Sequence, residues 1–495
     1  MKFQSTRGND TNKYSSAFVI KQGIADDGGL FVPDSIPSVT LEEISSYCSL
    51  SYPDLAATVL YKFLSDYTYD ELLADASAAY CAQSFDGGVC PLHKVDDTTF
   101  SLELWHGPTC AFKDMALQIM PRLLSRALVK TDEKKTALVL VATSGDTGKA
   151  ALEGYKNVDG VKIVVFYPEN GVSKIQKLQM VTQDGDNVDV CAVKGNFDDI
   201  QSTVKRIFGD AEIAQSLKNE GFFFSSANSI NFGRLAPQIV YYIKAYCDLI
   251  VSKEITLGES INVCVPTGNF GNILAAYIAK LMGLPIEKLI CASNSNNILT
   301  DFLETGVYDR NRDFHLTISP SMDILISSNL ERLLYMIAGG DKTKLWMDDL
   351  KRSGRYRIDD QTLSAIKESF IGYCADEEKT KTTINRIFNE FGYLIDTHTA
   401  VAFSALNDYR CESADMRKTV IASTASPYKF AKDVYSSLGY SDATDDTSIL
   451  KTLSAATGTD VPLPLATLDK KNVNFTSVKT PETMIEEIFD FIKTK

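Results

Sequence analysis

The sequence is poor in histidine and has no closely spaced cysteines, and both features limit the chemistry it can support. The four histidines are His93, His106, His315 and His398. Because they lie far apart, a histidine-rich metal site has no support. The ten cysteines include no Cys-x-x-Cys pair, and several, such as Cys191, Cys264 and Cys291, stand in strand-like apolar runs. We therefore expect reduced, buried thiols, as in a cytoplasmic protein, and no metal.

Blocks of positive charge and long apolar runs are also missing. The formal net charge is -14 and the sequence pI is near 4.9, so nucleic acid is not an expected partner. No apolar run approaches the length that spans a membrane, and the first residues lack the continuous apolar stretch of a signal peptide. We expect a cytoplasmic protein without a membrane partner, which binds anions only locally, through backbone amides and a few cations.

The middle of the chain alternates short β-branched runs with helical patterns. This order is typical of an α/β fold in which a mostly parallel sheet is covered by helices. In open sheets of this kind, ligands bind at the carboxyl ends of the strands, where the loops to the following helices lie. The predicted strands are Ala137–Ala142, Lys162–Phe166, Val188–Val193, Ile261–Val265, Lys288–Ala292 and Thr419–Ala422.

The length of 495 residues, 44% of them hydrophobic, is sufficient for two or three domains. We expect an N-terminal unit over residues 1–95, helical between Leu41 and Tyr80. A smaller α/β domain is predicted over 96–235 and a larger one over 236–495. The charge-rich stretch at about 341–381 is predicted to be helical additions rather than sheet.

A loop of small residues, Thr143-Ser144-Gly145-Asp146-Thr147-Gly148, follows the first predicted strand, and a helix is expected from Lys149. Backbone amides at a helix N-terminus can surround a carboxylate or a phosphate. The Gly-Lys-Ser/Thr ending of the Walker nucleotide loop is absent. A simple capped turn explains the loop equally well, so both interpretations stay open.

A second loop, "TGNFGN" at 267–272, is the stronger candidate for a phosphate site. It stands between a buried strand that ends at Pro266 and an apolar helix that closes at Gly283. Gly268 and Gly271 would permit positive φ and close backbone approach. Successive amides at a helix start suit a dianionic phosphate. One Gly-Asn pair is usually only a turn, but two pairs in this position favour phosphate binding.

Two further polar segments precede helices. Residues 423–426 lead to Pro427, and an ordinary N-cap is the favoured interpretation there. In the stretch 228–234, Arg234 is suited to grip an anion by two oxygens. A solvated arginine at a helix start accounts for the same spacing.

Lys113 is the most unusual residue of the sequence. In "HGPTCAFKDMALQ" a helical apolar run begins after Asp114, which places Lys113 in a first turn, where the helix dipole disfavours a cation. Phe112 and Met115 suggest apolar surroundings, so desolvation should also lower the lysine pKa. A neutral amine suits a Schiff base with an aldehyde cofactor. Together with the phosphate loop, it indicates pyridoxal phosphate (PLP). In isolation, such a lysine is usually solvated surface.

Eight stretches resemble those of the threonine synthases and occur in the family's order. They are "FQSTRG", "DGGLFVP", "ELWHGPTCAFKD", "ATSGDTGKAAL", "NSINFGRLAPQ", "VPTGNFGN", "THTAVAF" and "STASPYKFA". The resemblance runs from residue 3 to about 431 and is greatest to the longer branch shared by many bacteria and fungi. It implies a fold-type II PLP enzyme, similar in fold to the β subunit of tryptophan synthase, with parallel sheets covered by helices.

The resemblance implies roles for particular residues. Lys113 would bind the cofactor covalently, and Thr424 would face its pyridine nitrogen. The cofactor phosphate would be held by Gly268, Asn269, Phe270, Gly271 and Asn272. The amino-acid end of the substrate would meet Thr143, Ser144, Asp146 and Thr147. The candidates for the substrate phosphate are Asn231 and Arg234.

The implied activity is that of a PLP-dependent carbon–oxygen lyase. It would convert O-phospho-L-homoserine and water to L-threonine and phosphate, the last step of threonine biosynthesis, as a monomer or homodimer. One alternative is a related dehydratase or phospholyase that acts on another amino substrate. The other is a non-catalytic homologue that binds PLP, against which the intact Lys113, Asp146 and 268–272 argue.

A few positions depart from the family's pattern. Cys110 stands where leucine is common, and Trp105 where phenylalanine is. Thr397 replaces a proline before His398, and Ser426 replaces a histidine. None of these changes removes a reacting group, but they leave the roles of Thr397, His398 and Ser426 open.

Overall fold

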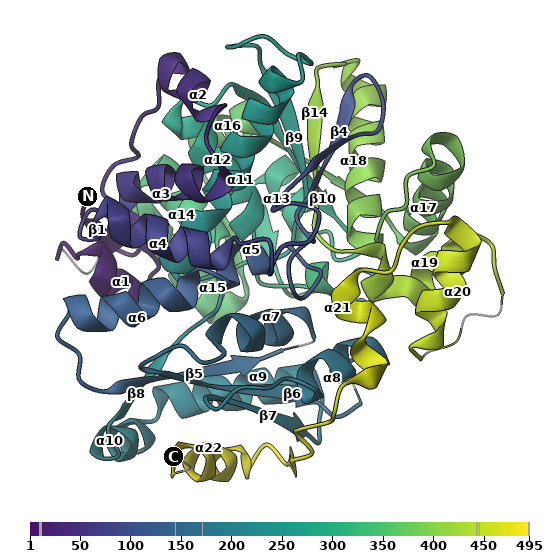
Figure 1. Ribbon diagram of the computed structural model, residues 1–495. Coiled ribbons are helices and arrows are strands. Elements are labelled where there is room, and N and C mark those ends of the chain that lie inside the picture. Colours follow the sequence, from purple (N-terminus) through teal and green to yellow (C-terminus); the bar gives the residue numbers. More distant parts are fainter. Residues whose placement is uncertain (9–11, 144, 171, 442–443, 445, 494–495) are drawn as a thin grey trace.

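Figure 1 shows the computed structural model, in which two separate sheets are each covered by helices. The structure describes residues 1–8, 12–143, 145–170, 172–441, 444 and 446–493. The larger sheet occupies the upper part of the view, and the smaller sheet the lower part. Among the described residues, no helix has both the length and the apolar character needed to cross a membrane.

The larger sheet has six strands in the order β13-β10-β9-β14-β4-β3. Neighbouring strands are parallel except for the antiparallel pair β3–β4. Every residue of β9 is buried, as expected for a parallel strand covered on both faces. The strands are β3 (Leu92–Lys94), β4 (Thr99–Glu103), β9 (Ile261–Pro266), β10 (Ile286–Ser293), β13 (Phe370–Cys374) and β14 (Thr419–Ser423).

The smaller sheet has five parallel strands in the order β15-β7-β6-β5-β8. Its last strand and the C-terminal helix α22 (Met484–Lys493) come from the end of the chain, and Figure 1 shows α22 along the lower face. Met484 and Ile488 of α22 pack in one core cluster with Leu138 and Phe166. The strands are β5 (Thr136–Ala142), β6 (Val161–Pro168), β7 (Val188–Val193), β8 (Phe222–Ser225) and β15 (Val478–Lys479).

Helices form most of the N-terminal unit and cover the sheets. The N-terminal unit has β1 (Phe3–Ser5), β2 (Phe31–Pro33), α1 (Ser16–Gln22), α2 (Leu41–Tyr47), α3 (Tyr52–Phe63) and α4 (Tyr69–Ala79). Then follow α5 (Asp114–Leu117), α6 (Met120–Lys130), α7 (Asp146–Tyr155), α8 (Lys174–Val181), α9 (Phe197–Gly209), α10 (Ala211–Asn219), α11 (Phe232–Val251) and α12 (Gly271–Met282). The remaining elements are α13 (Ile298–Thr305), β11 (Val307–Asp309), α14 (Leu330–Ala338), α15 (Gly340–Ser353), β12 (Arg355–Arg357), α16 (Asp360–Ser369), α17 (Glu377–Phe391), α18 (Thr397–Ser413), α19 (Ala431–Ser437), α20 (Ser448–Thr457) and α21 (Leu463–Ala466).

The predicted α/β class and the six predicted strands are confirmed, since each predicted range lies within an observed strand. The helical character of 41–80 is confirmed by α2, α3 and α4. The strand pairing departs from the predicted division in two places. The strand β4, at residues 99–103, belongs to the larger sheet, although the smaller domain is predicted from residue 96. The strand β15 and helix α22 return from the end of the chain to the smaller sheet.

The prediction that 341–381 holds only helical additions is wrong. The strand β12 pairs with β11, and β13 forms one edge of the larger sheet. The apolar run of β13 is five residues long and follows helix α16 directly, so charged flanking residues obscure it in the sequence.

The helical run after Lys113 is interrupted between α5 and α6. Pro121 stands in the first turn of α6 and has no N–H with which to reach the carbonyl of Leu117, four residues earlier. That carbonyl packs against Gly154 of α7, where a Cβ would lie 1.8 Å from the Leu117 oxygen. The short helix that follows the lysine is therefore held in place by close contact with α7.

We predict that Gly154→Ala destabilises the protein by about 2 kcal/mol or more, because the methyl group forces α5 and α7 apart. The matched control is Gly209→Ala in α9, where a Cβ meets no atom within 4 Å. That change should be neutral or add about 0.5–1 kcal/mol of stability. Urea unfolding measures the stability of both variants. Equal stabilities of the two would contradict the close contact between Gly154 and the Leu117 carbonyl.

Candidate active site

Lys113 is the N-cap residue of α5, one position before the first turn in which the sequence places it. The loop that follows β14 holds the backbone of this segment. The Phe112 N–H donates to the Thr424 carbonyl at 2.8 Å, and the Ser426 N–H donates to the Cys110 carbonyl at 3.0 Å. Ser426, whose role the sequence leaves open, therefore anchors the lysine segment through its backbone.

The Lys113 amine lies in the protein interior, and the residue is only 7% exposed. Its Nζ donates to Ser321 Oγ at 3.2 Å and lies 3.5 Å from Asp146 Oδ2. Burial lowers the pKa of Lys113 from its ordinary value, the Asp146 carboxylate opposes the shift, and the charge of Arg234 adds to it. The predicted direction is confirmed, with desolvation as the main cause.

The Asp146 carboxylate lies between two lysines at the start of α7, which begins here rather than at Lys149 as predicted. The Nζ of Lys429, whose side chain is fully buried, lies 2.9 Å from Asp146 Oδ1, and Gln176 Nε2 donates to the same oxygen at 3.0 Å. Burial alone would raise the pKa of Asp146, but attraction by Lys429 and Lys113 outweighs it and holds that pKa well below its usual range. Lys429 thus still compensates Asp146 when Lys113 is neutral.

A histidine and an aspartate hold the segment that carries Ser321. The Ser321 N–H donates to His398 Nε2 at 3.1 Å, and His398 Nδ1 lies 2.7 Å from Asp396 Oδ2. Because Nε2 accepts, the ring proton is on Nδ1 and donates to the carboxylate. Thr397 Oγ1 donates to the Ile318 carbonyl at 2.7 Å. The structure therefore gives His398 and Thr397 a supporting position behind Ser321.

The loop between β9 and α12 forms a cup of free amide groups. Within the described part of the chain, the backbone N–H groups of residues 268–272 donate to no acceptor. Asn272 is buried, its Oδ1 accepts from the Tyr241 and Tyr242 hydroxyls at 2.5 and 2.6 Å, and its Nδ2 has no partner among the described residues. A buried unpaired donor beside free amides at a helix N-terminus fits the phosphate of the predicted cofactor.

The predicted positive φ at Gly268 and Gly271 is wrong, because Phe270 takes the left-handed conformation instead, with φ 61°. Gly268 is required for close approach, since a Cβ there would lie 2.5 Å from the Ser321 carbonyl oxygen. At Gly271 the nearest atom, Asn329 Nδ2, would be 3.4 Å from a Cβ, so a methyl group fits. Packing therefore requires glycine at position 268 but not at position 271.

Ser321 brings the lysine and the cup together. Its hydroxyl contacts the Lys113 amine, while its carbonyl packs on Gly268. Thr424 is 5% exposed and borders the same interior through the hydrogen bond from Phe112. The predicted cofactor residues from three distant parts of the chain therefore surround one region, at the carboxyl ends of β9 and β14.

Arg234 is a buried cation without an acidic partner. It is 6% exposed, and the one hydrogen bond of its guanidinium to the described residues runs from Nη1 to the Ala227 carbonyl at 2.9 Å. Burial lowers the pKa of Arg234 to about 10, so it remains charged at neutral pH. Since a buried charge is costly unless it is paired, this guanidinium fits an anionic ligand.

Asn231 has no free side-chain donor for the predicted contact with a substrate phosphate. Its Nδ2 donates to the Ile20 and Ser226 carbonyls at 2.9 and 3.2 Å, and its Oδ1 accepts from the Gly233 N–H at 2.9 Å. Both amide hydrogens are therefore in use. Asn231 caps α11 and so positions Arg234, three residues later.

The remaining predicted substrate residues lie around the start of α7. The Thr143 hydroxyl accepts from the N–H groups of Gly145 and Gly148 at 2.9 and 3.0 Å, which shapes the loop. Thr147 lies in the first turn of α7 and is half-buried. Ser144 lies outside the described residues.

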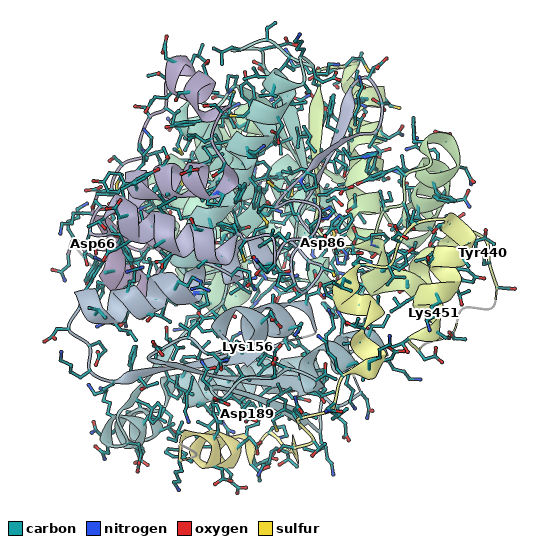
Figure 2. The ribbon with its side chains drawn as sticks, viewed as in Figure 1. Asp66, Asp86, Lys156, Asp189, Tyr440 and Lys451 are labelled. Carbon is teal, nitrogen blue, oxygen red and sulfur yellow. The ribbon has the colours of Figure 1, made fainter. Side chains whose placement is uncertain are left out.

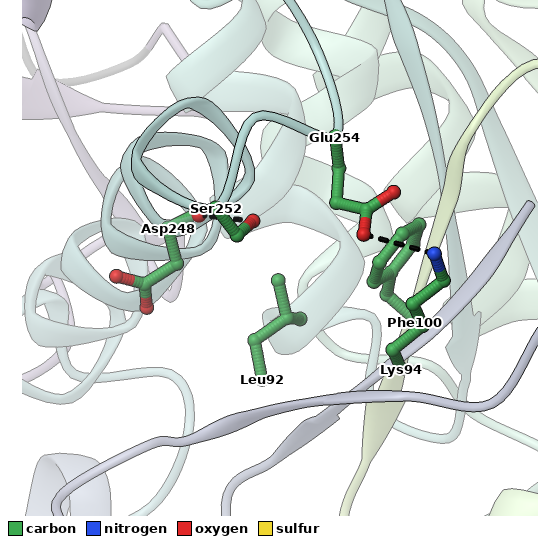
Figure 3. A pocket seen from close by; sticks show the side chains of 6 residues that line it. All are labelled: Leu92, Lys94, Phe100, Asp248, Ser252 and Glu254. Atoms are coloured by element: carbon green, nitrogen blue, oxygen red, sulfur yellow. Dashed lines mark hydrogen bonds and ion pairs between the residues drawn. The ribbon is translucent and has the colours of Figure 1, made fainter. Parts of the chain in front are cut away.

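Figure 2 draws the side chains on the ribbon, where they occupy most of the space between the elements, and Lys113, Asp146 and Thr424 of the candidate site are buried. A cavity of about 180 Å³ lies elsewhere, where β3 and β4 approach the end of α11 (Figure 3). Its charged groups Lys94 and Glu254 pair with each other at 2.9 Å. Its lining includes none of the residues predicted for the site, so it is not the candidate active site.

Sequence reasoning missed several residues that contact the site, namely Ser321, Lys429, Gln176 and Asp396. Lys429 lies in the stretch "STASPYKFA", and its place in an otherwise apolar segment before a helix was the available signal. Ser321 and Gln176 carry no such signal, because only the fold brings them to Lys113 and Asp146.

Comparison with known proteins gives consistent results. The family described as "Pyridoxal-phosphate dependent enzyme" matches residues 91–424, and "Threonine synthase N terminus" matches 2–80. A Pseudomonas aeruginosa threonine synthase is 39% identical over 76% of this chain and 78% of its own. Human threonine synthase-like 1 is 40% identical over 74% of this chain. The chain spans about half the length of this human protein. The structure of PLP-bound threonine synthase from Brucella melitensis superposes with a TM-score of 0.89, at 35% identity and 100% coverage of both chains.

We predict that Lys429→Met costs about 3 kcal/mol of stability at pH 7, because it removes the main counter-charge of buried Asp146. Asp146→Asn should cost a similar amount, and the double variant should lose less than the sum of the two. Since the folded-state pKa of Asp146 is depressed, this stabilisation is present above pH ~4 and lost as the pH falls. Urea unfolding at pH 7 and pH 3 checks both points, and simple additivity would contradict the pairing.

Proposed function

The chain belongs to the pyridoxal-phosphate-dependent enzymes and, among them, to the threonine synthase family, and from this premise we propose that it converts O-phospho-L-homoserine and water to L-threonine and phosphate. The observation that carries the proposal is the pairing of a buried amine with two separate anion sites in one interior. These are the amide cup of 268–272 and the unpaired guanidinium of Arg234. A cofactor phosphate and a substrate phosphate would account for both.

The residues that hold the cofactor are proposed as follows. Lys113 binds it covalently, the N–H groups of 268–272 and the Asn272 side chain hold its phosphate, and Thr424 lies at its pyridine nitrogen. Bound PLP would supply an electron sink that stabilises negative charge on the substrate carbon next to the amine. Its phosphate would give the unpaired Asn272 Nδ2 an acceptor.

Lys113 is the proposed base and acid for the proton transfers. Burial favours its neutral form, so the amine can take a proton from one carbon of the substrate and return it to another. Asp146 and Ser321 hold the amine in place, with contacts at 3.5 and 3.2 Å. Since Lys429 keeps Asp146 ionised, the charge state of the carboxylate need not change when the lysine gains or loses its proton.

The substrate is held at its two ends. Thr143, Thr147 and the amides at the start of α7 are proposed for the amino-acid end, and Arg234 for the phosphate. The small exposure of Lys113 and Arg234 keeps bulk water from the reacting carbons, so that water enters at one step only. We propose a monomer or homodimer, and ten free cysteines support a reducing cytoplasmic location.

We predict that the purified protein, supplied with O-phospho-L-homoserine, releases threonine and phosphate in equal amounts. Lys113→Ala should abolish both products and the visible absorption band of the bound cofactor, while far-ultraviolet circular dichroism stays unchanged. Phosphate release without threonine would favour a phospholyase or dehydratase. A wild-type protein that binds PLP but turns over no amino substrate would favour the non-catalytic alternative.

We also predict that Arg234→Ala lowers kcat/KM for O-phospho-L-homoserine by about 10²-fold or more but changes PLP affinity little. A phosphate carries roughly -1.5 to -2 charges near pH 7, and arginine binds two of its oxygens at once. Arg234→Lys should rescue the rate only partly, because it restores the charge without the planar fork. Inhibition by inorganic phosphate should weaken in parallel. Kinetics and phosphate inhibition like those of the wild type would exclude Arg234 from the site.

A further inference from the structure

The stretches "FQSTRG" and "DGGLFVP" of the N-terminal unit contribute no reacting group, yet both contact the start of α14. Thr6 Oγ1 donates to Glu331 Oε1 at 2.6 Å, and the Arg7 guanidinium pairs with the same carboxylate at 3.0 Å. The next residue of α14, Arg332, donates from Nε to the Phe31 carbonyl at 3.0 Å. The N-terminal unit is thus tied to the first turn of one helix.

Arg332 is completely buried, and its guanidinium reaches three different segments. Besides Phe31, it donates to the Ile230 carbonyl and, at 3.5 Å, to the Ser229 carbonyl. It also donates to Asn329 Oδ1. No carboxylate of the described residues lies within ion-pair distance, and burial lowers the pKa of Arg332 to about 9. The charge therefore remains at neutral pH and is balanced by oriented carbonyl oxygens.

Asn329 connects Arg332 to the phosphate cup. Its Nδ2 and its backbone N–H both donate to the Asn269 carbonyl, at 3.0 and 3.1 Å. In a planar trans peptide the carbonyl and the following N–H point in opposite directions. Because Asn329 holds the Asn269 carbonyl on the outside of the cup, the N–H of the next residue, Phe270, points into the cup.

The other carbonyls that Arg332 holds belong to the segment that leads into α11. Ser229 and Ile230 directly precede Asn231, the N-cap residue of the helix that carries Arg234. Arg332 thus lies between the two candidate anion sites and contacts the backbone supports of both. Its planar fork supplies several directed donors at once, which an ammonium group cannot match.

We propose that Arg332 is a positioning residue that fixes the phosphate cup and the Arg234 segment relative to each other, with the N-terminal unit as its third support. The inference rests on the proposed function for the identity of the two anions. It gives the N-terminal unit a part in cofactor and substrate binding, although that unit supplies no group that touches either.

The test compares Arg332→Lys with Arg410→Lys. Arg410 is a matched control, because it too donates to backbone and hydroxyl oxygens, those of Thr98, Thr99 and Thr419, but at the opposite ends of β4 and β14. Two affinities are measured by titration: that of apo-protein for PLP, and that of holoenzyme for inorganic phosphate. Urea unfolding gives the stability of each variant.

Arg332→Lys should weaken both affinities by about tenfold or more, as expected when hydrogen bonds from a charged group are lost. Arg410→Lys should lose stability but leave both affinities within about twofold of the wild type. Equal loss of stability in the two variants, with both affinities unchanged, would overturn the proposal. Because PLP titration does not depend on the substrate, a failure here is distinguishable from an error in the assigned reaction.

Asn329→Ala serves as a second variant should Arg332→Lys fail to fold. It removes the side-chain link from Arg332 to the Asn269 carbonyl but leaves the contacts of Arg332 with Phe31 and Ile230. We expect weaker PLP binding and an unchanged affinity of the holoenzyme for phosphate. Unchanged PLP binding would show that this link does not shape the phosphate cup and would contradict the proposal.

Discussion

An amine that is to accept protons near neutral pH must be held out of water, and this constraint organises the interior. Burial lowers the pKa of Lys113, but a buried lysine beside a buried aspartate would leave the carboxylate unbalanced whenever the amine is neutral. Lys429 balances the Asp146 charge, since it pairs with the other oxygen of this carboxylate and is itself fully buried. The lysine can thus change its charge without a change in the ionisation of Asp146.

The net charge of -14 describes the whole chain, but several buried cations gather around the candidate site. Lys113, Lys429, Arg234 and Arg332 are all buried, and the two arginines have no ion-pair partner among the described residues. The two guanidinium groups are compensated only by carbonyl dipoles. Buried cations of this kind favour a ligand with several negative charges. The positive charge that can bind an anion is thus confined to the candidate site, within a chain whose net charge is negative.

The sequence allows the α/β class, the six main strands and the loop at the start of α12 to be predicted, because each rests on a local pattern of apolar and small residues. It does not allow the pairing of β4 with the larger sheet to be predicted, since that partner strand lies more than three hundred residues away along the chain. The same limit applies within the site. Ser321 contacts Lys113 across 208 positions, and a single serine in a short 3-10 helix has no distinguishing signal. Asn231 shows the reverse case, because the sequence suggests a ligand for the substrate phosphate while in the structure its side chain caps α11.

The return of the C-terminus to the smaller sheet has a consequence for the order in which a newly made chain can fold. The larger sheet has all its strands once β14 has been synthesised, at residue 423. Four of the five strands of the smaller sheet, β5 to β8, lie between residues 136 and 225, but its edge strand β15 and helix α22 follow only at 478–493. Until then, β7 is an unpaired edge, and the apolar face of Leu138, Val164 and Phe166 has the cover of α9 but lacks that of α22. The smaller sheet is therefore completed after the larger one, although most of its strands precede β9 in the chain, and its β7 edge stays open to pairing until β15 has been made.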